Sequence, residues 1–175
     1  MRNAVLYIAM SLDGYIADEG GGIGWLQGDG SDPRHPGSYP AFFETVDTIV
    51  MGGRTYRQIV TELSPGCWPY EGRQTYVLTH RQPADREGVV FTAQDPRALL
   101  AALRRQEGKD IWICGGASVA AQLWEEIDRF HITVVPTLLG KGTSLFPAPG
   151  ARLPLELVST QRYNGMVDLV YRRRA

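Results

Sequence analysis

Residues 111–118, IWICGGAS, constrain the fold of this chain more than any other segment. A short apolar run ends in Gly115 and Gly116, and the segment VAAQLWEEI that follows has the pattern of a helix. A strand that turns directly into a helix leaves free backbone N–H groups at the first helical turn, where an anionic phosphate is favoured. The segment therefore predicts a nucleotide-binding turn, although paired glycines can also serve only to let a strand and a helix pack closely. The spacing differs from the GxGxxG fingerprint, and no GxxxxGK(S/T) loop occurs in the chain.

Two further strand ends carry groups suited to phosphate. In MGGRTY, residues 51–56, Arg54 offers a fork of N–H donors and Thr55 a hydroxyl at a helix start. The alternative makes Thr55 a simple helix cap and Arg54 a solvated surface charge. LTHR, residues 78–81, ends a third strand in groups that could hold a monophosphate on a ribose, or form an ordinary polar loop: Thr79, His80 and Arg81. Together the segments predict a dinucleotide with an extra phosphate, NADP rather than NAD.

Strand and helix patterns alternate along most of the chain. Asp95 and Pro96 mark a helix start, and Asn164 and Gly165 form a hairpin turn between two alternating apolar runs. The pattern predicts an α/β fold with a mixed, mainly parallel sheet flanked by helices and an antiparallel C-terminal hairpin. Ligands of such sheets lie at the carboxyl ends of the strands. Strands are expected at 4–10, 15–18, 47–53, 75–80, 88–93, 110–116, 130–136, 155–163 and 166–172, and helices at 40–46, 54–63, 96–106 and 117–127.

Composition excludes several classes of protein. The 175 residues fit one domain, 1–175, and 18 basic against 19 acidic residues give no field for nucleic acid. The chain has two cysteines, Cys67 and Cys114, which do not indicate a disulfide framework. No Cys or His stands at metal-ligand spacing. No apolar run approaches a membrane span. We expect a cytoplasmic protein without metal, membrane or nucleic-acid partner.

The motifs resemble those of the dihydrofolate reductase superfamily. AMSLDGYIAD, a Gly-rich loop leading to Trp25 and Leu26, MGGRTY, VLTH, ICGGAS and PTLLGKGTSLFP occur in that family's order. The chain is most similar to the reductase (C-terminal) domain of the bifunctional deaminase-reductase of bacterial riboflavin biosynthesis and to its stand-alone relatives. The resemblance runs from Ala4 to about Tyr171. It implies a single-domain dihydrofolate reductase-like fold that uses NADPH.

The resemblance also assigns roles. Ala9 and Ile16 should border the nicotinamide, and residues 19–24 should form a flexible lid. The pyrophosphate, adenosine and 2′-phosphate should be held by Gly53, Arg54, Thr55, Thr79, His80, Arg81, Gly115, Gly116, Ala117, Ser118 and Val119. Thr133 matches a substrate-side threonine.

The proton donor is the main departure from the family. Dihydrofolate reductase proper has a buried carboxylate on the helix before MGR, where this chain has Ser38 or Tyr39. The candidates for catalysis are Asp13, Tyr39 and Thr133, or a bound water. Asp13 could equally fix the SLDG turn through its own backbone. Trp25, Tyr39 and Thr133 are the candidates for substrate binding, although Trp25 could instead anchor the lid.

The expected function is an NADPH-dependent oxidoreductase that transfers hydride to a small planar heterocycle of pterin or pyrimidine type. Examples are 5-amino-6-(5-phosphoribosylamino)uracil and a dihydrofolate-like compound. One alternative is an NADP-binding protein of the same fold without efficient turnover. Another is a nucleotide-dependent transferase, which the missing phosphate-loop lysine disfavours. Relatives with this hairpin often form homodimers, so we expect a homodimer.

Overall fold

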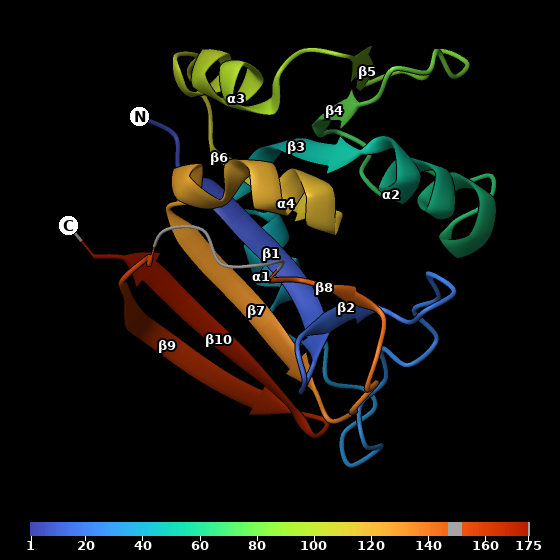
Figure 1. Ribbon diagram of the computed structural model, residues 1–175, viewed down its shortest axis with the longest axis vertical. Coiled ribbons are helices and arrows are strands. Elements are labelled where there is room, and N and C mark those ends of the chain that lie inside the picture. Colours follow the sequence, from blue (N-terminus) through green and yellow to red (C-terminus); the bar gives the residue numbers. More distant parts are fainter. Residues whose placement is uncertain (147–151, 175) are drawn as a thin grey trace.

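The backbone is organised around one eight-stranded sheet. The computed structural model describes residues 1–146 and 152–174, and its sheet has the order β5-β4-β3-β6-β1-β7-β10-β9 (Figure 1). Neighbouring strands are parallel from β5 to β7, whereas β10 is antiparallel to both β7 and β9. The strands are β1 (Ala4–Ser11), β3 (Val46–Gly52), β4 (Gln74–Leu78), β5 (Val89–Thr92), β6 (Asp110–Gly115), β7 (Arg129–Val135), β9 (Leu155–Tyr163) and β10 (Met166–Arg173). The expected mixed, mainly parallel sheet with its C-terminal hairpin is confirmed.

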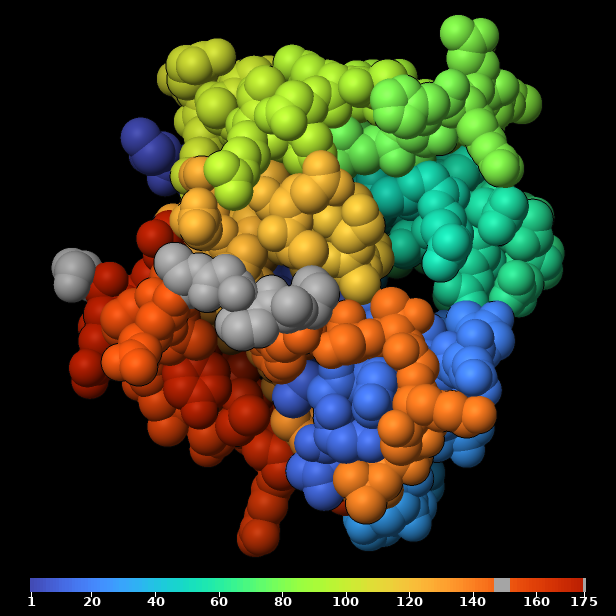
Figure 2. Space-filling view, viewed as in Figure 1, coloured from blue at the N-terminus to red at the C-terminus, as the bar shows by residue number. Residues whose placement is uncertain are grey.

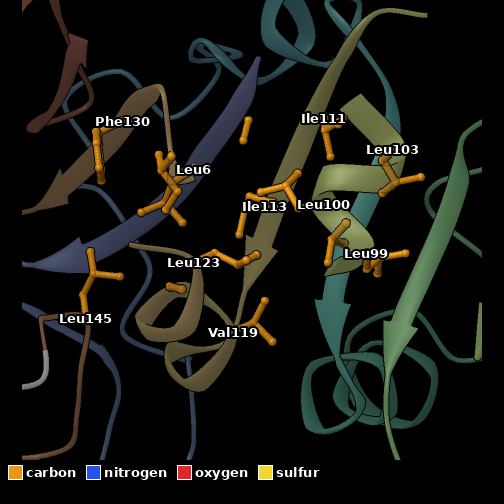
Figure 3. Close-up of a cluster of buried hydrophobic side chains, with 14 of the residues drawn as sticks. Leu6, Leu99, Leu100, Leu103, Ile111, Ile113, Val119, Leu123, Phe130 and Leu145 are labelled. Carbon is orange, nitrogen blue, oxygen red and sulfur yellow. The ribbon is translucent and has the colours of Figure 1, made fainter. Parts of the chain in front are cut away.

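Helices cover both faces of the sheet because each face presents apolar side chains. They are α1 (Tyr39–Phe43), α2 (Gly53–Gln58) with a π-helical extension (Ile59–Leu63), α3 (Pro96–Arg104), and α4 (Ala117–Leu123) with a 3₁₀ turn (Trp124–Glu126). Leu100 of α3 and Leu123 of α4 belong to one buried cluster, and Phe42 of α1 and Tyr56 of α2 to another. The α4 helix (yellow) lies at the centre of the surface in Figure 2, and Figure 3 shows the cluster beneath it.

Local signals explain where several elements begin and turn. The Asp95 carboxylate accepts a hydrogen bond from the Ala98 N–H (2.9 Å) and caps α3. Asn164 (φ 48°) and Gly165 (φ 72°) both adopt the left-handed conformation that a two-residue hairpin turn requires. The predicted cap and the predicted hairpin turn are therefore confirmed.

The second expected strand departs from the main sheet. Strand β2 (Tyr15–Ala17) pairs antiparallel with β8 (Thr143–Ser144) in a separate small sheet. The sequence did not predict β8, because two residues are too few to show a periodic pattern. The pairing is extended by a hydrogen bond from the Leu145 N–H to the Gly14 carbonyl (2.9 Å).

Within residues 1–146 and 152–174, no helix is both long enough and apolar enough to cross a lipid bilayer.

Candidate functional site

A cleft of about 930 Å³ opens at the carboxyl ends of the parallel strands. In Figure 2 the segments that border the cleft adjoin one another. They are α4 (yellow), α2 (teal), the loop that follows β2 (blue) and residues 137–146 (orange). Eleven of the predicted cofactor residues line this cleft, namely Ala9, Ile16, Gly53, Arg54, Thr55, Thr79, His80, Gly116, Ala117, Ser118 and Val119. The strand order brings together side chains from segments that are far apart in the sequence. Their cofactor roles remain predictions.

Two of the predicted glycines allow close backbone packing at the cleft, although Gly115 itself does not line it. Gly115 has φ +104°, a conformation that favours glycine, and is joined to Gly116 by a cis peptide bond. At Gly53 a Cβ would lie 3.0 Å from the Thr79 Oγ1 atom, so a side chain there would crowd the cleft wall. The residues preceding α2 and α4 are also glycines, Gly52 and Gly116, and neither helix has a side-chain cap. The Gly52 and Gly116 positions therefore supply no side chain that could accept a hydrogen bond from the first turn of either helix.

A second hollow of about 600 Å³ adjoins the cleft and is rich in arginine. Arg54, Arg57 and Arg81 line it, and it shares Gly53 and Thr79 with the larger cleft. Guanidinium groups gathered in this way form a positive site matched to phosphate oxygens. Arg81, which the sequence predicted near the 2′-phosphate, thus lies beside the cleft rather than in its wall.

Asp13 has a structural role in the described fold. Its carboxylate accepts hydrogen bonds from Ser11 Oγ (2.6 Å) and from the backbone N–H groups of Leu139 (3.1 Å) and Gly140 (2.7 Å). The hydrogen bond from Ser11 contributes most to holding the pKa of Asp13 below its ordinary value. An ionised carboxylate that joins two loops accepts hydrogen bonds and has no proton to give, which favours the turn-fixing interpretation over the catalytic one.

Trp25 and Tyr39 also lie outside the residues that line the cleft. The Trp25 indole N–H donates to the Gly22 carbonyl (3.2 Å), so Trp25 anchors its own loop. Tyr39 packs edge-on against Trp112. Burial raises the pKa of Tyr39 to about 12, so its phenol keeps its proton at neutral pH. Cys114 packs against the buried cluster that contains Trp112 and also lines the cleft.

Thr133 belongs to a buried polar group that we call the Asp168 cluster. The Thr133 hydroxyl donates to Asp168 Oδ1 (2.6 Å), and the Tyr163 hydroxyl donates to the same oxygen (3.1 Å). Ser38 Oγ lies 3.0 Å from both His131 Nε2 and the Tyr7 hydroxyl. The members of the cluster are Tyr7, Ser38, His131, Thr133, Tyr163 and Asp168.

The electrostatics of the Asp168 cluster favour an ionised carboxylate. Burial alone would raise the pKa of Asp168, but the neighbouring His131, Ser38 and Thr133 side chains outweigh it and hold the pKa below its ordinary value. Burial raises the pKa of Tyr7 to about 12, so this hydroxyl remains protonated. A negative charge with 1% residue exposure is thus surrounded by hydroxyl and imidazole groups.

Sequence reasoning missed this carboxylate. Asp168 interrupts the apolar alternation of MVDLVYR. A charged residue at an inward position of a strand is rarely buried without a role, and this was the sequence signal that could have indicated a functional carboxylate. Other parts of the cleft wall were not assigned to the site from the sequence: Gln58, Ile59, Leu63, Tyr70, Gln122 and Thr143, together with residues 92–96.

Comparison with known proteins agrees with this architecture. A family model described as the RibD C-terminal domain matches residues 3–168. YwjB, an uncharacterised protein of Bacillus subtilis (strain 168), is 39% identical over 178 residues, covering 98% of each chain.

Solved structures are also similar. A protein of Shewanella sp. PV-4, provisionally named a riboflavin biosynthesis protein, has a TM-score of 0.82 at 29% identity, with 99% of each chain covered. A pyrimidine reductase-like protein of Corynebacterium diphtheriae has a TM-score of 0.71 at 17% identity, with 99% of this chain and 92% of that chain covered. The latter likeness concerns the fold, which is dihydrofolate reductase-like. The match over nearly the whole sequence shows that the chain belongs to the family of the RibD C-terminal domain.

Proposed function

We propose that this protein is an NADPH-dependent reductase that transfers hydride to a small planar nitrogen heterocycle. The family supports a reductase role. The observation that carries the proposal is the gathering of glycine turns, Ala9 and Ile16 around one cleft, with an arginine-rich hollow beside it. A dinucleotide needs such a long cleft with phosphate-binding groups toward one end.

The residues present fit this cofactor. The starts of α2 and α4 line the cleft and have no side-chain cap, and Arg54 and Arg81 supply positive charge in and beside the cleft. NADP differs from NAD by one ribose phosphate, which an arginine fork recognises well. Preference for NADPH over NADH should therefore depend on Arg54 and Arg81.

The protein's part in the reaction is to bind, orient and exclude water. When bound, the nicotinamide supplies the hydride. Ala9 and Ile16 lie on the cleft wall, and the lid at residues 19–24 is attached to α2 by a hydrogen bond from Gln58 Nε2 to the Gly21 carbonyl (3.1 Å). Closure of this lid would shield the reacting atoms from water. Since Asp13 is ionised, we assign the proton to a bound water or to a hydroxyl such as Tyr39 or Thr133.

The substrate class follows from the same proposal. One named relative structure is a deaminase/5-amino-6-(5-phosphoribosylamino)uracil reductase of Thermotoga maritima, of which this chain covers 57%. A phosphorylated ribose on the substrate would need cationic side chains, for which Arg34, His35 and Lys141 are the candidates in this chain. In the structure Lys141 Nζ lies 2.5 Å from the Glu19 carboxylate, and His35 stacks on Tyr163. Because Lys141 and His35 already have these partners, they are poorly placed to bind a substrate phosphate. We therefore propose three alternative substrates: the ribose phosphate compound, an unphosphorylated heterocycle and a folate-like heterocycle.

Titration calorimetry with NADPH, NADH and ATP tests the proposal. We expect wild type to prefer NADPH, and the Arg54→Ala, Arg81→Ala double variant to lose about 100-fold in NADPH affinity with little change for NADH. Arg105→Ala, an exposed change at the end of α3, is the matched control. No NADPH binding by the wild type would reject the cofactor assignment.

The alternatives predict different results in the same experiment. An NADP-binding protein without turnover would bind NADPH but oxidise it with none of a panel of pterins and pyrimidines. A nucleotide-dependent transferase would prefer ATP with Mg²⁺ over NADPH. Steady NADPH oxidation with any member of the panel would exclude both.

We also propose that the protein forms a homodimer through strand β9. Leu157 and Val158 are 52% and 54% exposed on this edge strand, and Val167 of β10 is 38% exposed. Exposed apolar residues on an unpaired sheet edge are suited to pairing with a second copy. Sedimentation should give twice the chain mass of 19.4 kDa for wild type and the single mass for Val158→Glu. A monomeric wild type would contradict this proposal.

A further inference from the structure

One oxygen of the Asp168 carboxylate lacks a hydrogen-bond donor. Oδ1 accepts from Thr133 and Tyr163, whereas Oδ2 is buried and has no hydrogen-bond partner among the residues that the structure describes. His131 Nε2 lies 3.6 Å from Oδ2, and it also lies 3.0 Å from Ser38 Oγ. The cluster therefore solvates one half of the carboxylate and leaves the other half open.

A buried, ionised oxygen without a donor is costly and demands a physical reason. Buried polar atoms in folded proteins are almost always paired, and the exceptions are often functional. The pKa of Asp168 is held below its ordinary value, so the carboxylate stays charged at neutral pH. Taking up a proton would remove the energetic cost of burying the charge, but this does not occur. Asp168 Oδ2 is thus an acceptor that could bind an N–H or O–H donor of a ligand.

Strand register connects this oxygen to the cleft. Ala9 of β1 faces Thr133 of β7, and Thr133 faces Asp168 of β10. Directly paired residues project to the same side of a sheet, so the three side chains form one row. The row runs from the cleft wall at Ala9 to the carboxylate over two strand spacings, which is about 10 Å. A ring held against Ala9 could therefore direct its far edge toward Asp168.

A polar segment packs against the end of the hairpin, next to Tyr163 of the cluster. Residues 28–37, which we call the cover loop, are held by Asn164, whose Oδ1 accepts from the N–H groups of Gly30 (3.0 Å) and Asp32 (3.1 Å). The His35 ring of this loop stacks on Tyr163, with ring centroids 5.0 Å apart. Most of the loop is exposed and few contacts hold it, so its displacement would give a ligand access to the cluster.

From these observations we propose that Asp168 is a specificity-determining residue that binds a pair of adjacent N–H donors on the edge of the heterocyclic substrate. The inference rests on the proposed function and deepens it, because it names the edge that is recognised. An ionised carboxylate accepts two parallel hydrogen bonds from a ring N–H and a neighbouring amino group. Thr133 and Tyr163 position the carboxylate, and Oδ2 gains the donor that it lacks.

The chemistry favours aminopyrimidines over pyrimidines without the amino group. In 6-aminouracil the ring N1–H and the 6-amino group are adjacent donors. In uracil the same N1–H has a C–H neighbour on that side, so only one donor faces the carboxylate. The two compounds differ by a single amino group, and they therefore isolate the second hydrogen bond.

Calorimetric titration of 6-aminouracil and uracil, with NADP⁺ at saturation, tests the proposal. We expect wild type to bind 6-aminouracil about 10- to 100-fold more tightly than uracil, as a charge-assisted hydrogen bond requires. Asp168→Asn should abolish this preference while its NADPH affinity stays at the wild-type value. Glu156→Gln, which changes an exposed carboxylate on β9, is the matched control and should keep the preference.

Each contrary outcome has a distinct meaning. An Asp168→Asn protein that binds NADPH normally and retains the preference would overturn the inference, as would a wild type that binds neither heterocycle. If Asp168→Asn fails to fold, amide chemical shifts of the wild type decide instead. 6-Aminouracil should then shift Thr133 and Asp168, and shifts confined to other residues would overturn the proposal. If the wild type does not bind NADPH, the proposed function is rejected. The inference about Asp168 then depends only on whether the protein prefers 6-aminouracil to uracil.

Discussion

The cleft at the strand ends and the Asp168 cluster are two regions of the molecule that are built in opposite ways. The cleft is open and is made from short contiguous motifs, each a strand end followed by a turn. The cluster is closed, and its members come from five separate segments that meet only through strand pairing and the loop before α1. Local sequence specifies the first region, whereas the sheet's register specifies the second. The two regions should therefore respond differently to substitution.

Thr133→Val should give the largest effect, and it should act on the cluster. The variant removes the hydroxyl that donates to Asp168 Oδ1 and leaves a buried charge less well solvated. We expect a loss of about 2 kcal/mol in the free energy of unfolding at pH 7, measured with urea. Thr160→Val, at an exposed position on β9, should change it by less than about 0.5 kcal/mol.

The same variant has a signature in its pH dependence. In the wild type the pKa of Asp168 is lower when folded than its ordinary value of 3.8, so its charge stabilises the fold above that pH and the stabilisation is lost as the pH falls through the folded pKa. Thr133→Val should raise the folded pKa and reduce the loss between pH 7 and about pH 3. An unchanged slope would show that the hydroxyl does not solvate the charge.

Gly115→Ala should be next in size, and it should act on the cleft. The residue has φ +104°, and a Cβ would lie 3.3 Å from Ile8 Cδ1. We expect a loss of about 1–1.5 kcal/mol in the free energy of unfolding, measured with urea, together with weaker NADPH binding. Gly24→Ala has open space around it and no left-handed φ, so it serves as the control. Equal stability of the two variants would refute the conformational argument.

Asn164→Ala should separate the two regions dynamically. Loss of the side-chain carbonyl frees the Gly30 and Asp32 N–H groups, at a cost of about 1 kcal/mol. Amide hydrogen exchange should accelerate in the cover loop at residues 28–37 and remain unchanged at α2 and α4. Faster exchange throughout the cleft would show that the regions are coupled rather than independent.

Asp13→Asn should have the smallest effect. The Leu139 and Gly140 N–H groups donate to different oxygens of the carboxylate, so the single amide oxygen of asparagine keeps one of these two hydrogen bonds, and one link between the loops remains. With any substrate that is turned over, we expect kcat within about threefold of the wild type, whereas loss of a general acid costs about 100-fold or more. A loss of that size would restore Asp13 as a catalytic residue.

The sequence predicted the fold well because its signals are local. The Asp95 cap, the Asn164 and Gly165 turn and the glycine-ended strands each act over a few residues, and all are present in the structure. Strand β8 could not be predicted, since it exists only because β2 lies beside it.

In the candidate site as well, residues in local motifs were predicted and residues brought together by strand pairing were not. The glycines and the phosphate-suited side chains were found from their motifs, and all of them except Gly115 and Arg81 line the cleft. Asp168 was missed because its importance depends on facing Thr133 across a strand pair that no short motif encodes. The sequence pointed to Ser38 or Tyr39 as equivalents of the missing carboxylate, and Ser38 indeed belongs to the cluster, but the acid itself comes from β10.

The reversal of direction at β10 has a consequence for the order in which the site is made. Every residue that lines the cleft precedes Asp168 in the chain, and β10 is the strand that pairs with β7. As the polypeptide leaves the ribosome, all the residues that line the cleft emerge before the acid that completes the cluster. Nascent chains halted between β8 and β10 should bind nucleotide before they can distinguish one heterocycle from another.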